Sequence, residues 1–357
     1  MQNFDIIVES PIQKTYRSQV TVGTYDITDE KITERFTGCI DIEKEADWSI
    51  GIIYGNSGTG KSTIAREVFG EECIYVPEHH NQCVLDDFPK NLDIKTIHQM
   101  LISVGFSSPP SWLKPYSVLS TGEKMRVDLA MALLSDRDIV VFDEYTSVVD
   151  RTVAKIGSMA VAKSIRRTKK KFVAVSCHSD IIEWLQPDWE FCTNDMSFMR
   201  RSHRRPKIEL SIYETKGYWP MFSKYHYLAH NMNNASKQYV AFYENVPVAI
   251  TCVLPQCGQK NMYREHRTVT HPDYQGVGIG STLSDFIAHK YVSSGKRYRS
   301  VTSNPAFIKH REKSPNWILV FSGRNNRLHA IRRLGGAGNR KVTAWEYVIN
   351  DDKKDKE

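Results

Sequence analysis

The sequence lacks any long hydrophobic run. Apolar residues make up 41% of the 357 residues, but their runs stay as short as residues 139–142, and the mean hydropathy is −0.44. A helix that crosses a membrane needs about 20 consecutive, mostly apolar residues. The sequence therefore predicts no membrane-spanning segment.

A disulfide framework is missing as well. The seven cysteines are odd in number and scattered along a long chain, whereas disulfide-rich secreted domains are short and pair their cysteines. The first residues, MQNFD, do not have the basic and then apolar pattern of a secretory signal. We therefore expect a cytoplasmic protein.

Acidic residues are fewer than basic ones. Lys and Arg number 48 against 41 Asp and Glu, which gives a formal charge of +7. The excess gathers in three runs, at residues 163–171, 200–205 and 323–341. Such runs bind acidic polymers, and they are as typical of solvated faces and linkers. Nucleic acid is therefore one candidate partner.

The length corresponds to about two to three domains at roughly 100–200 residues each. The basic segment RRSHRRP interrupts an apolar, turn-punctuated sequence and ends in proline, which often marks an element boundary. We predict an N-terminal domain over residues 1–199, a basic linker over 200–206, a C-terminal domain over 207–350 and a charged tail over 351–357.

A phosphate-binding loop follows an apolar strand. Residues 49–54 have a buried-strand pattern, residues 64–69 have a helical one, and GNSGTGKST lies between them. This GxxxxGKS motif in a strand–loop–helix context lets backbone amides surround phosphates, while Lys61 reaches the β/γ-phosphates and the Ser62 hydroxyl binds Mg²⁺. The predicted nucleotide-binding residues are Gly55, Asn56, Ser57, Gly58, Thr59, Gly60, Lys61, Ser62 and Thr63.

Two adjacent carboxylates follow a second apolar strand. Residues 139–142 run into Asp143 and Glu144. Nucleotide sites of open α/β sheets lie at the carboxyl ends of the strands. We expect Asp143 to hold Mg²⁺, directly or through water, and Glu144 to activate the attacking water.

The order of further motifs resembles that of the ATP-binding cassette (ABC) ATPases. LSTGEKMR at 119–126 stands between the two motifs above, and SVVD at 147–150 and FVAVSCH at 172–178 follow them. The resemblance covers roughly residues 1–195. It implies ATP as ligand and a head-to-tail homodimer, in which the signature residues of one subunit close on the nucleotide of the other. The residues that it implies are Ser120 and Gly122 in the signature, Gln82 as the Q-loop glutamine and His178 as the H-loop histidine.

The sequence departs from that family in several places. The signature reads LSTGE, with Thr121 in place of a glycine and Glu123 in place of glutamine, and Tyr145 stands where the family usually has proline. Gln82 follows the P-loop at an unusually short spacing, and a core histidine is the alternative for His178. Cys73, His79, His80 and Cys83 cluster near Gln82, but their spacing fits no standard zinc pattern, so we expect a connecting segment there.

The C-terminal part begins as a meander of short strands. Residues 208–213, 238–243, 248–253 and 263–270 have strand patterns, and a glycine-containing loop then leads into a helical pattern over 281–291. Glycines before a helix N-terminus form an anion cradle. A dinucleotide-binding domain would instead begin with its glycine loop.

The loop sequence QGVGIG after this meander resembles the motif of the GNAT family of acyl-CoA-dependent N-acyltransferases. The resemblance spans roughly residues 207–350. It implies an α/β P-loop domain followed in the sequence by an α+β acyl-CoA fold, and a reaction in which an amine attacks a thioester directly. It implies acetyl-CoA, or another acyl-CoA, as cofactor. The strand end at Val269 and Thr270 would hold the pantetheine arm, and the pyrophosphate would lie on Gln275, Gly276, Val277, Gly278, Ile279 and Gly280.

The acid and base of the transfer are less defined. Strand alternation predicts Glu265, Arg267 and Val269 on one face and His266, Thr268 and Thr270 on the other. Glu265, His266 and Asp273 are all candidates, which the sequence does not separate. Many GNAT enzymes use a tyrosine as acid on the helix after the next strand, but residues 300–307 contain none.

The combination resembles bacterial and phage proteins in which a cassette ATPase is joined to a predicted acetyltransferase. One hypothesis is an enzyme that couples ATP hydrolysis to N-acyl transfer onto an amine, with a nucleic-acid base as one acceptor, as in DNA modification of the phage type. The alternative is an ATP-gated clamp for nucleic acid or protein, in which the GNAT-like domain only recognises its target.

Overall fold

A computed structural model describes residues 2–28, 31–42, 47–80, 82–201, 207–226, 231–324 and 341–350. The chain divides into two compact units. The first comprises Met1–Glu78, Met131–Asp150 and Ala162–Pro206, and the second His79–Ala130, Arg151–Val161 and Lys207–Glu357. Two segments of the N-terminal half thus group with the C-terminal residues, and the predicted domain boundaries stay a prediction. Most of the predicted linker, 202–206, and the tail at 351–357 lie outside the described residues.

The first unit is built on a six-stranded sheet of order β4-β5-β6-β3-β7-β8. Neighbouring strands are parallel except β7 and β8. Parallel strands covered on both faces have almost continuous apolar sequences, as IVVF in β5 shows. The strands are β3 Ile50–Tyr54, β4 Ile74–Tyr75, β5 Ile139–Phe142, β6 Lys171–Ser176, β7 Trp189–Cys192 and β8 Ser197–Arg200, and helices α2 Lys61–Phe69 and α7 Ile181–Leu185 belong to the same unit.

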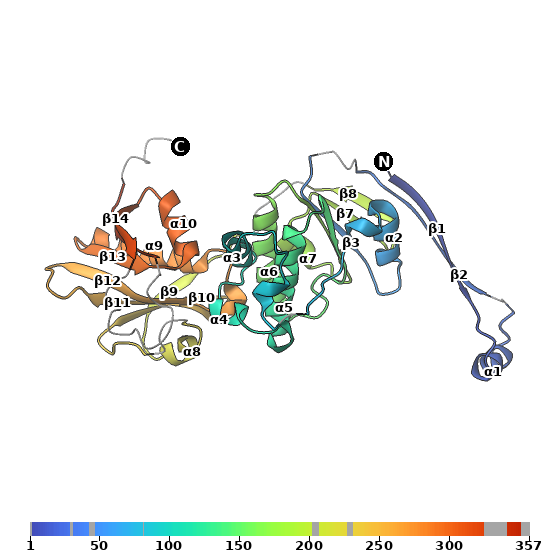
Figure 1. The fold of residues 1–357 in the computed structure, drawn as a ribbon, viewed down its shortest axis with the longest axis horizontal. Coiled ribbons are helices and arrows are strands. Elements are labelled where there is room, and N and C mark those ends of the chain that lie inside the picture. The colour runs from blue at the N-terminus through green and yellow to red at the C-terminus, as the bar shows by residue number, and fades with distance from the viewer. Residues whose placement is uncertain are drawn as a thin grey trace. The chain divides into compact units, whose positions relative to one another are not determined.

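An antiparallel hairpin precedes this sheet. Strands β1 Gln2–Pro11 and β2 Lys31–Ile40 pair along their whole length, and α1 Tyr16–Thr24 lies at the far end of the hairpin (Figure 1). Phe4 of β1 packs edge-on against Phe191 of β7, with ring centroids 5.8 Å apart. The near end of the hairpin is therefore fixed to the core of the first unit.

The second unit contains short helices from the N-terminal half. They are the 3-10 helices at Val84–Asp87 and Tyr116–Val118, α3 Ile94–Ser103 and α4 Pro109–Trp112. The long helices α5 Thr121–Leu134 and α6 Arg151–Ile165 begin in this unit and end in the first. Throughout the described ranges, each helix is too short or too polar to cross a membrane.

A seven-stranded sheet of order β14-β15-β13-β12-β11-β10-β9 forms the C-terminal part of the second unit. Helix α9 Ile279–Ser293 packs on one face through Leu283, Ile287 and Tyr291, and α8 Trp219–Ser223 packs on the other (Figure 1). Helix α10 Pro305–Lys313 follows β13. The strands are β9 Ser211–Glu214, β10 Lys237–Tyr243, β11 Val246–Pro255, β12 Met262–Thr270, β13 Arg297–Thr302, β14 Trp317–Arg324 and β15 Lys341–Tyr347.

The predicted alternation along β12 is wrong. Cys252 pairs with Arg267 but Val253 pairs with Glu265, so His266 is an extra residue in β12. Such a β-bulge shifts the two-residue period by one position. Glu265 therefore shares a face with Thr268, whose hydroxyl donates to its carboxylate, and Val269 packs on the opposite face with the cluster of α8.

Candidate functional site

The P-loop connects β3 to α2 in the first unit. Gly60 is the N-cap of α2 with a left-handed φ of 78°, and a Cβ there would come within 2.7 Å of the Phe36 ring. Lys61 Nζ donates to the carbonyl of Asn56 at 2.6 Å, across the loop. Amides at a helix N-terminus and an inward-curving lysine form an anion site. The loop therefore fits a nucleotide phosphate chain.

Two residues that the sequence analysis missed hold this loop. The Asn56 amide donates to Asn194 Oδ1 at 2.9 Å, and the hydroxyls of Thr59 and Thr193 hydrogen-bond to each other. Thr193 also donates to the carbonyl of Tyr54 at 3.2 Å. Asn194 lies 138 positions from Asn56 in the sequence, so no local pattern could have marked it.

The acidic pair lies directly after β5. Because β5, β6 and β3 are parallel, Asp143 and Glu144 come at the same edge of the sheet as the P-loop. Glu144 has a positive φ of 54°, which is uncommon outside glycine. Its amide donates to Asp143 Oδ1 at 2.9 Å, and the Ser147 hydroxyl donates to Glu144 Oε2 at 2.6 Å. The two carboxylates are thus held in a tight, exposed turn.

The structure explains the tyrosine beside this pair. The Tyr145 amide donates to the carbonyl of Val175 at 2.8 Å, a bond that proline cannot make. The Tyr145 ring is fully buried against Phe142 and Phe172. His178 follows β6 in the same unit, is partly exposed and donates its amide to the Ser176 hydroxyl at 3.1 Å.

The signature residues lie in the second unit, at the start of α5. The Ser120 amide donates to Glu123 Oε2 at 3.0 Å, and the Glu123 amide donates to the Ser120 hydroxyl at 3.4 Å. This is a capping box, for which S-x-x-E is the sequence signal, and it accounts for the glutamate at 123. Gln82 is exposed in the same unit. The action of Gln82, Ser120 and Gly122 on a nucleotide stays a prediction.

The His79 side chain connects the segment near Gln82 to α5, the helix that begins at the signature. Its ring stacks on Tyr116 at 3.5 Å, and its Nε2 and Nδ1 lie 2.7 Å and 3.3 Å from Asp128 and Asp87. Burial by itself would lower the pKa of His79, but the two carboxylates outweigh it and raise the pKa. Among the described residues no three His, Cys, Asp or Glu side chains are grouped as a metal site.

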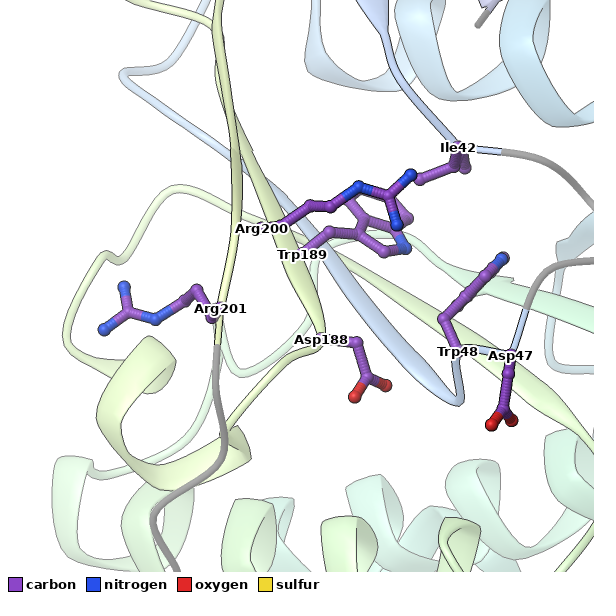
Figure 2. A pocket seen from close by; sticks show the side chains of 7 residues that line it. All are labelled: Ile42, Asp47, Trp48, Asp188, Trp189, Arg200 and Arg201. Carbon is purple, nitrogen blue, oxygen red and sulfur yellow. The ribbon is translucent and has the colours of Figure 1, made fainter.

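A cavity of about 450 Å³ lies near the starts of β3 and β7, at the sheet edge opposite the P-loop (Figure 2). Three of its charged side chains are engaged in the protein. Asp188 accepts from the amides of Ser49 and Ile50 at 2.7 Å. Arg200 donates to the Asp41 carbonyl at 2.7 Å, and Arg201 pairs with Glu190. We therefore assign these two arginines of the basic run a structural role. The cavity is lined by Ile42, Asp47, Trp48, Asp188, Trp189, Arg200 and Arg201.

The second glycine loop leads from β12 into α9. Gly278 is the N-cap of α9 with a left-handed φ of 108°, and a Cβ on Gly280 would lie 2.6 Å from the Thr270 hydroxyl. The loop is therefore pressed against the end of β12 and needs glycine. The Gln275 side chain donates to the Thr270 carbonyl at 3.1 Å and accepts from the Ser107 amide at 2.9 Å. The Gln275 side chain thus fixes the loop, and the use of the α9 N-terminal amides as an anion cradle stays a prediction.

The edge of β12 next to this loop is only partly paired. The ladder between the parallel strands β12 and β13 ends at Arg264 and Arg299, whereas β12 continues to Thr270. Backbone groups on a strand edge can hydrogen-bond an extended ligand. Val269 belongs to this stretch, and its contact with a pantetheine arm stays a prediction.

The three candidate acid–base residues have different surroundings. Glu265 accepts hydrogen bonds from Arg311 at 2.9 Å and Ser284 at 3.1 Å, and the side chain of Asp273 is 41% exposed. At the bulge, burial lowers the pKa of His266 to about 4, with help from the charges of Arg267 and Arg264. Near neutral pH His266 is thus an uncharged imidazole that can accept a proton.

The structure thus has a P-loop at the edge of a mostly parallel sheet and a second glycine loop between β12 and α9. The family model of the acetyltransferase (GNAT) family matches residues 180–308. A probable metal transport system ATP-binding protein of Thermotoga maritima is 29% identical in an alignment of 182 residues, which covers 43% of this chain and 72% of that protein. Elongation factor 3 of Gonapodya prolifera is 31% identical in an alignment of 157 residues, which covers 36% of this chain and 14% of that protein.

Two of the similar solved structures each cover a part of this chain. The ribosomal-protein-S18-alanine N-acetyltransferase of Escherichia coli covers 40% of this chain and 98% of its own, with a TM-score of 0.31 and 12% identity. The cbiO1 protein of Clostridium perfringens, part of the ABC transporter complex cbiONQ, covers 52% and 84%, with a TM-score of 0.35 and 16% identity.

One part of the chain is therefore similar to ABC ATPases, and residues 180–308 match the acetyltransferase (GNAT) family. Both homologies indicate an enzyme. The predicted fold class is confirmed. The GNAT match begins at residue 180, before the predicted boundary, and includes α7, β7 and β8 of the first unit.

Proposed function

We propose that this protein hydrolyses ATP as a cytoplasmic homodimer and uses that cycle to control acyl transfer from an acyl-CoA to an amine. The observation that carries the acyltransferase part is the left-handed glycine loop at the α9 N-terminus beside the unpaired edge of β12. An anion cradle next to an open strand edge suits a ligand with a pyrophosphate and an extended arm.

In the ATPase part, the amides of residues 55–63 and Lys61 bind the phosphates. Ser62 and Asp143 hold Mg²⁺, which neutralises phosphate charge when bound. Glu144 orients and activates the attacking water, and the bond from Ser147 fixes its carboxylate. His178, the H-loop histidine, lies after β6 at the same edge of the sheet and acts on the nucleotide. Gln82, Ser120 and Gly122 act on the nucleotide, the last two on that of the partner subunit.

In the acyltransferase part, the amides of residues 275–280 bind pyrophosphate and the edge at Val269 orients the pantetheine arm. The acyl-CoA supplies an activated thioester. The amine nitrogen forms the new C–N bond as the C–S bond breaks, His266 takes the amine proton, and CoA leaves as the thiolate and is then protonated. Glu265 is bound to Arg311 and so holds β12 to α10, while Asp273 shapes the loop.

The acceptor that we propose is an amine on a nucleic-acid base, as in DNA modification of the phage type. Arg264 and Arg299 face each other at the end of the β12–β13 ladder, and the charges of Arg264 and Arg267 act on His266. Glu346 pairs with both Arg299 and Arg297. One carboxylate does not offset all of these arginines, which leaves excess positive charge beside His266, the proposed catalytic base. Arginines bind nucleic-acid phosphates. The basic run at 323–341 lies almost wholly outside the described residues.

CoA release in the presence of DNA, tRNA or cellular amines tests this function. Mass spectrometry of nucleosides and proteins from cells with the active protein, with the Lys61→Ala variant and without either would then identify the acceptor by its added mass. Arg264→Ala should weaken binding of a nucleic acid at low salt and reduce the salt dependence. ATP hydrolysis that rises with DNA while CoA release stays at the buffer level would favour the clamp instead.

A further inference from the structure

The acyl-CoA loop is built onto the same segments that carry the ATPase signature. All of these residues belong to the second compact unit, which combines residues 79–130 and 151–161 with the C-terminal part. The Ser107 amide donates to Gln275 Oε1 at 2.9 Å, and a Cβ on Gly105 would lie 2.8 Å from the Gln275 carbonyl oxygen. The backbone before α4 therefore sets the position of the first loop residue.

Helix α5 makes a second connection. Arg126, one turn after the signature, is 2% exposed and its Nη2 donates to the Asp273 carbonyl at 3.4 Å. Burial lowers the pKa of this guanidinium, opposed by the charges of Asp273 and Glu123. Its Nε has no hydrogen-bond partner within the described part of the chain. A buried arginine is costly unless its bonds are made, so any shift of the loop away from α5 is penalised.

Helix α6, which begins directly after the SVVD segment at 147–150, makes the third connection. Ile156 is fully buried in the core of the acetyltransferase sheet together with Tyr243 and Tyr274. Lys155 pairs with Glu244 at 2.8 Å, and a Cβ on Gly276 would lie 2.7 Å from the Ala160 Cβ. Tyr274 and Gly276 flank Gln275, so α6 packs on both sides of the loop entrance.

We propose that Arg126 is a positioning residue for the acyl-CoA loop, through which ATP binding at the signature and acyl-CoA binding at residues 275–280 are coupled. This rests on the proposed function, in which the signature closes on ATP. A closure that shifts α5 and α6 must shift the loop residues packed against them, because close-packed elements move together. Coupling between two sites is reciprocal, so each ligand must change the affinity of the other by the same factor.

Calorimetric titration of the full chain with acetyl-CoA, with and without a saturating non-hydrolysable ATP analogue, tests the coupling. We expect the acetyl-CoA Kd to change at least about fivefold. The reverse titration must give the same factor in the same direction. Arg126→Met should bring the factor close to one while the analogue alone still binds with its original Kd. Arg126→Lys retains the positive charge but not the planar guanidinium group, and it should keep part of the change in the acetyl-CoA Kd.

Two further variants keep the test decisive. Arg17→Met, the same exchange at an exposed site on α1, should leave the factor unchanged. If Arg126→Met does not fold, Gly105→Ala takes its place, because its Cβ would press on the Gln275 carbonyl and should weaken acetyl-CoA binding. If the analogue does not change the acetyl-CoA Kd and acetyl-CoA does not change the Kd of the analogue, the coupling is overturned. If acetyl-CoA does not bind at all, the proposed function is overturned.

Discussion

The Glu265 carboxylate and the Arg311 guanidinium form an ion pair at 2.9 Å, with side chains that are only 6% and 1% exposed. The pair links β12 at its bulge to α10. Removal of one partner leaves the other charge buried and unpaired, so Arg311→Met should lower the free energy of unfolding by about 3–5 kcal/mol. Urea denaturation measures this value.

The exposed pair between Arg297 and Glu346 gives a matched control for that loss. Arg297 is 56% exposed, and exposed pairs contribute about 0–1 kcal/mol. Arg297→Met should therefore change the free energy of unfolding by no more than about 1 kcal/mol. Equal losses in the two variants would contradict a special role for the buried pair.

Glu144→Gln should retain ATP binding and lose hydrolysis, because the amide keeps the shape of the side chain but cannot activate water. The trapped nucleotide should then hold two subunits together. Lys61→Ala should lose nucleotide binding and dimerisation alike. Size-exclusion chromatography with and without ATP distinguishes the variants, and a Glu144→Gln protein that stays monomeric with bound ATP excludes the head-to-tail dimer.

Gly278→Asp should weaken acetyl-CoA binding at least tenfold. The substitution places a negative charge at the N-terminus of α9, where the phosphates are expected, and a side chain on a residue with φ of 108°. Gly295→Asp is the matched control, because Gly295 also has a positive φ, of 75°, and a Cβ there meets no atom within 4 Å. Calorimetry that shows equal affinities for the two variants would mean that the loop binds no ligand.

The free energy of unfolding should decrease as the pH is lowered, because His266 takes up a proton in the unfolded chain at a higher pH than in the folded protein. Burial holds the pKa of the folded side chain at about 4, against an ordinary value of 6.5. Between these two values the unfolded state binds a proton that the folded state does not, so acidification favours unfolding. Thermal melting from pH 7 to pH 4 should show a shallower loss for His266→Gln.

His266→Gln also tests the proposed base. It should lower kcat for acyl transfer by about 10²–10⁴-fold with little change in acetyl-CoA affinity. The exposed histidine His289 on α9 provides the control, since His289→Gln should leave kcat unchanged. An unchanged kcat in His266→Gln would remove His266 from the chemistry.

Both loops can be predicted from the amino-acid sequence alone, because each depends on local chemistry. GNSGTGKST and QGVGIG supply glycines with positive φ at the starts of α2 and α9, and neighbours along the chain suffice to form such turns. The strand before Asp143 and Glu144 is likewise predictable from its apolar run. The capping box of Ser120 and Glu123 was also present in the sequence, but it was interpreted as a departure from a family motif.

The contacts that hold these loops, and the acid–base candidates that are not engaged in other bonds, are visible only in the three-dimensional structure. Asn194 supports the P-loop, Arg311 binds Glu265, and Ser107 and Arg126 hold the acyl-CoA loop, each from a distant part of the chain. The extra residue at His266 places Glu265 on the face of Thr268 rather than on the predicted face of Arg267 and Val269. Register and long-range pairing depend on how whole elements pack together, and a single sequence does not encode them in any local pattern.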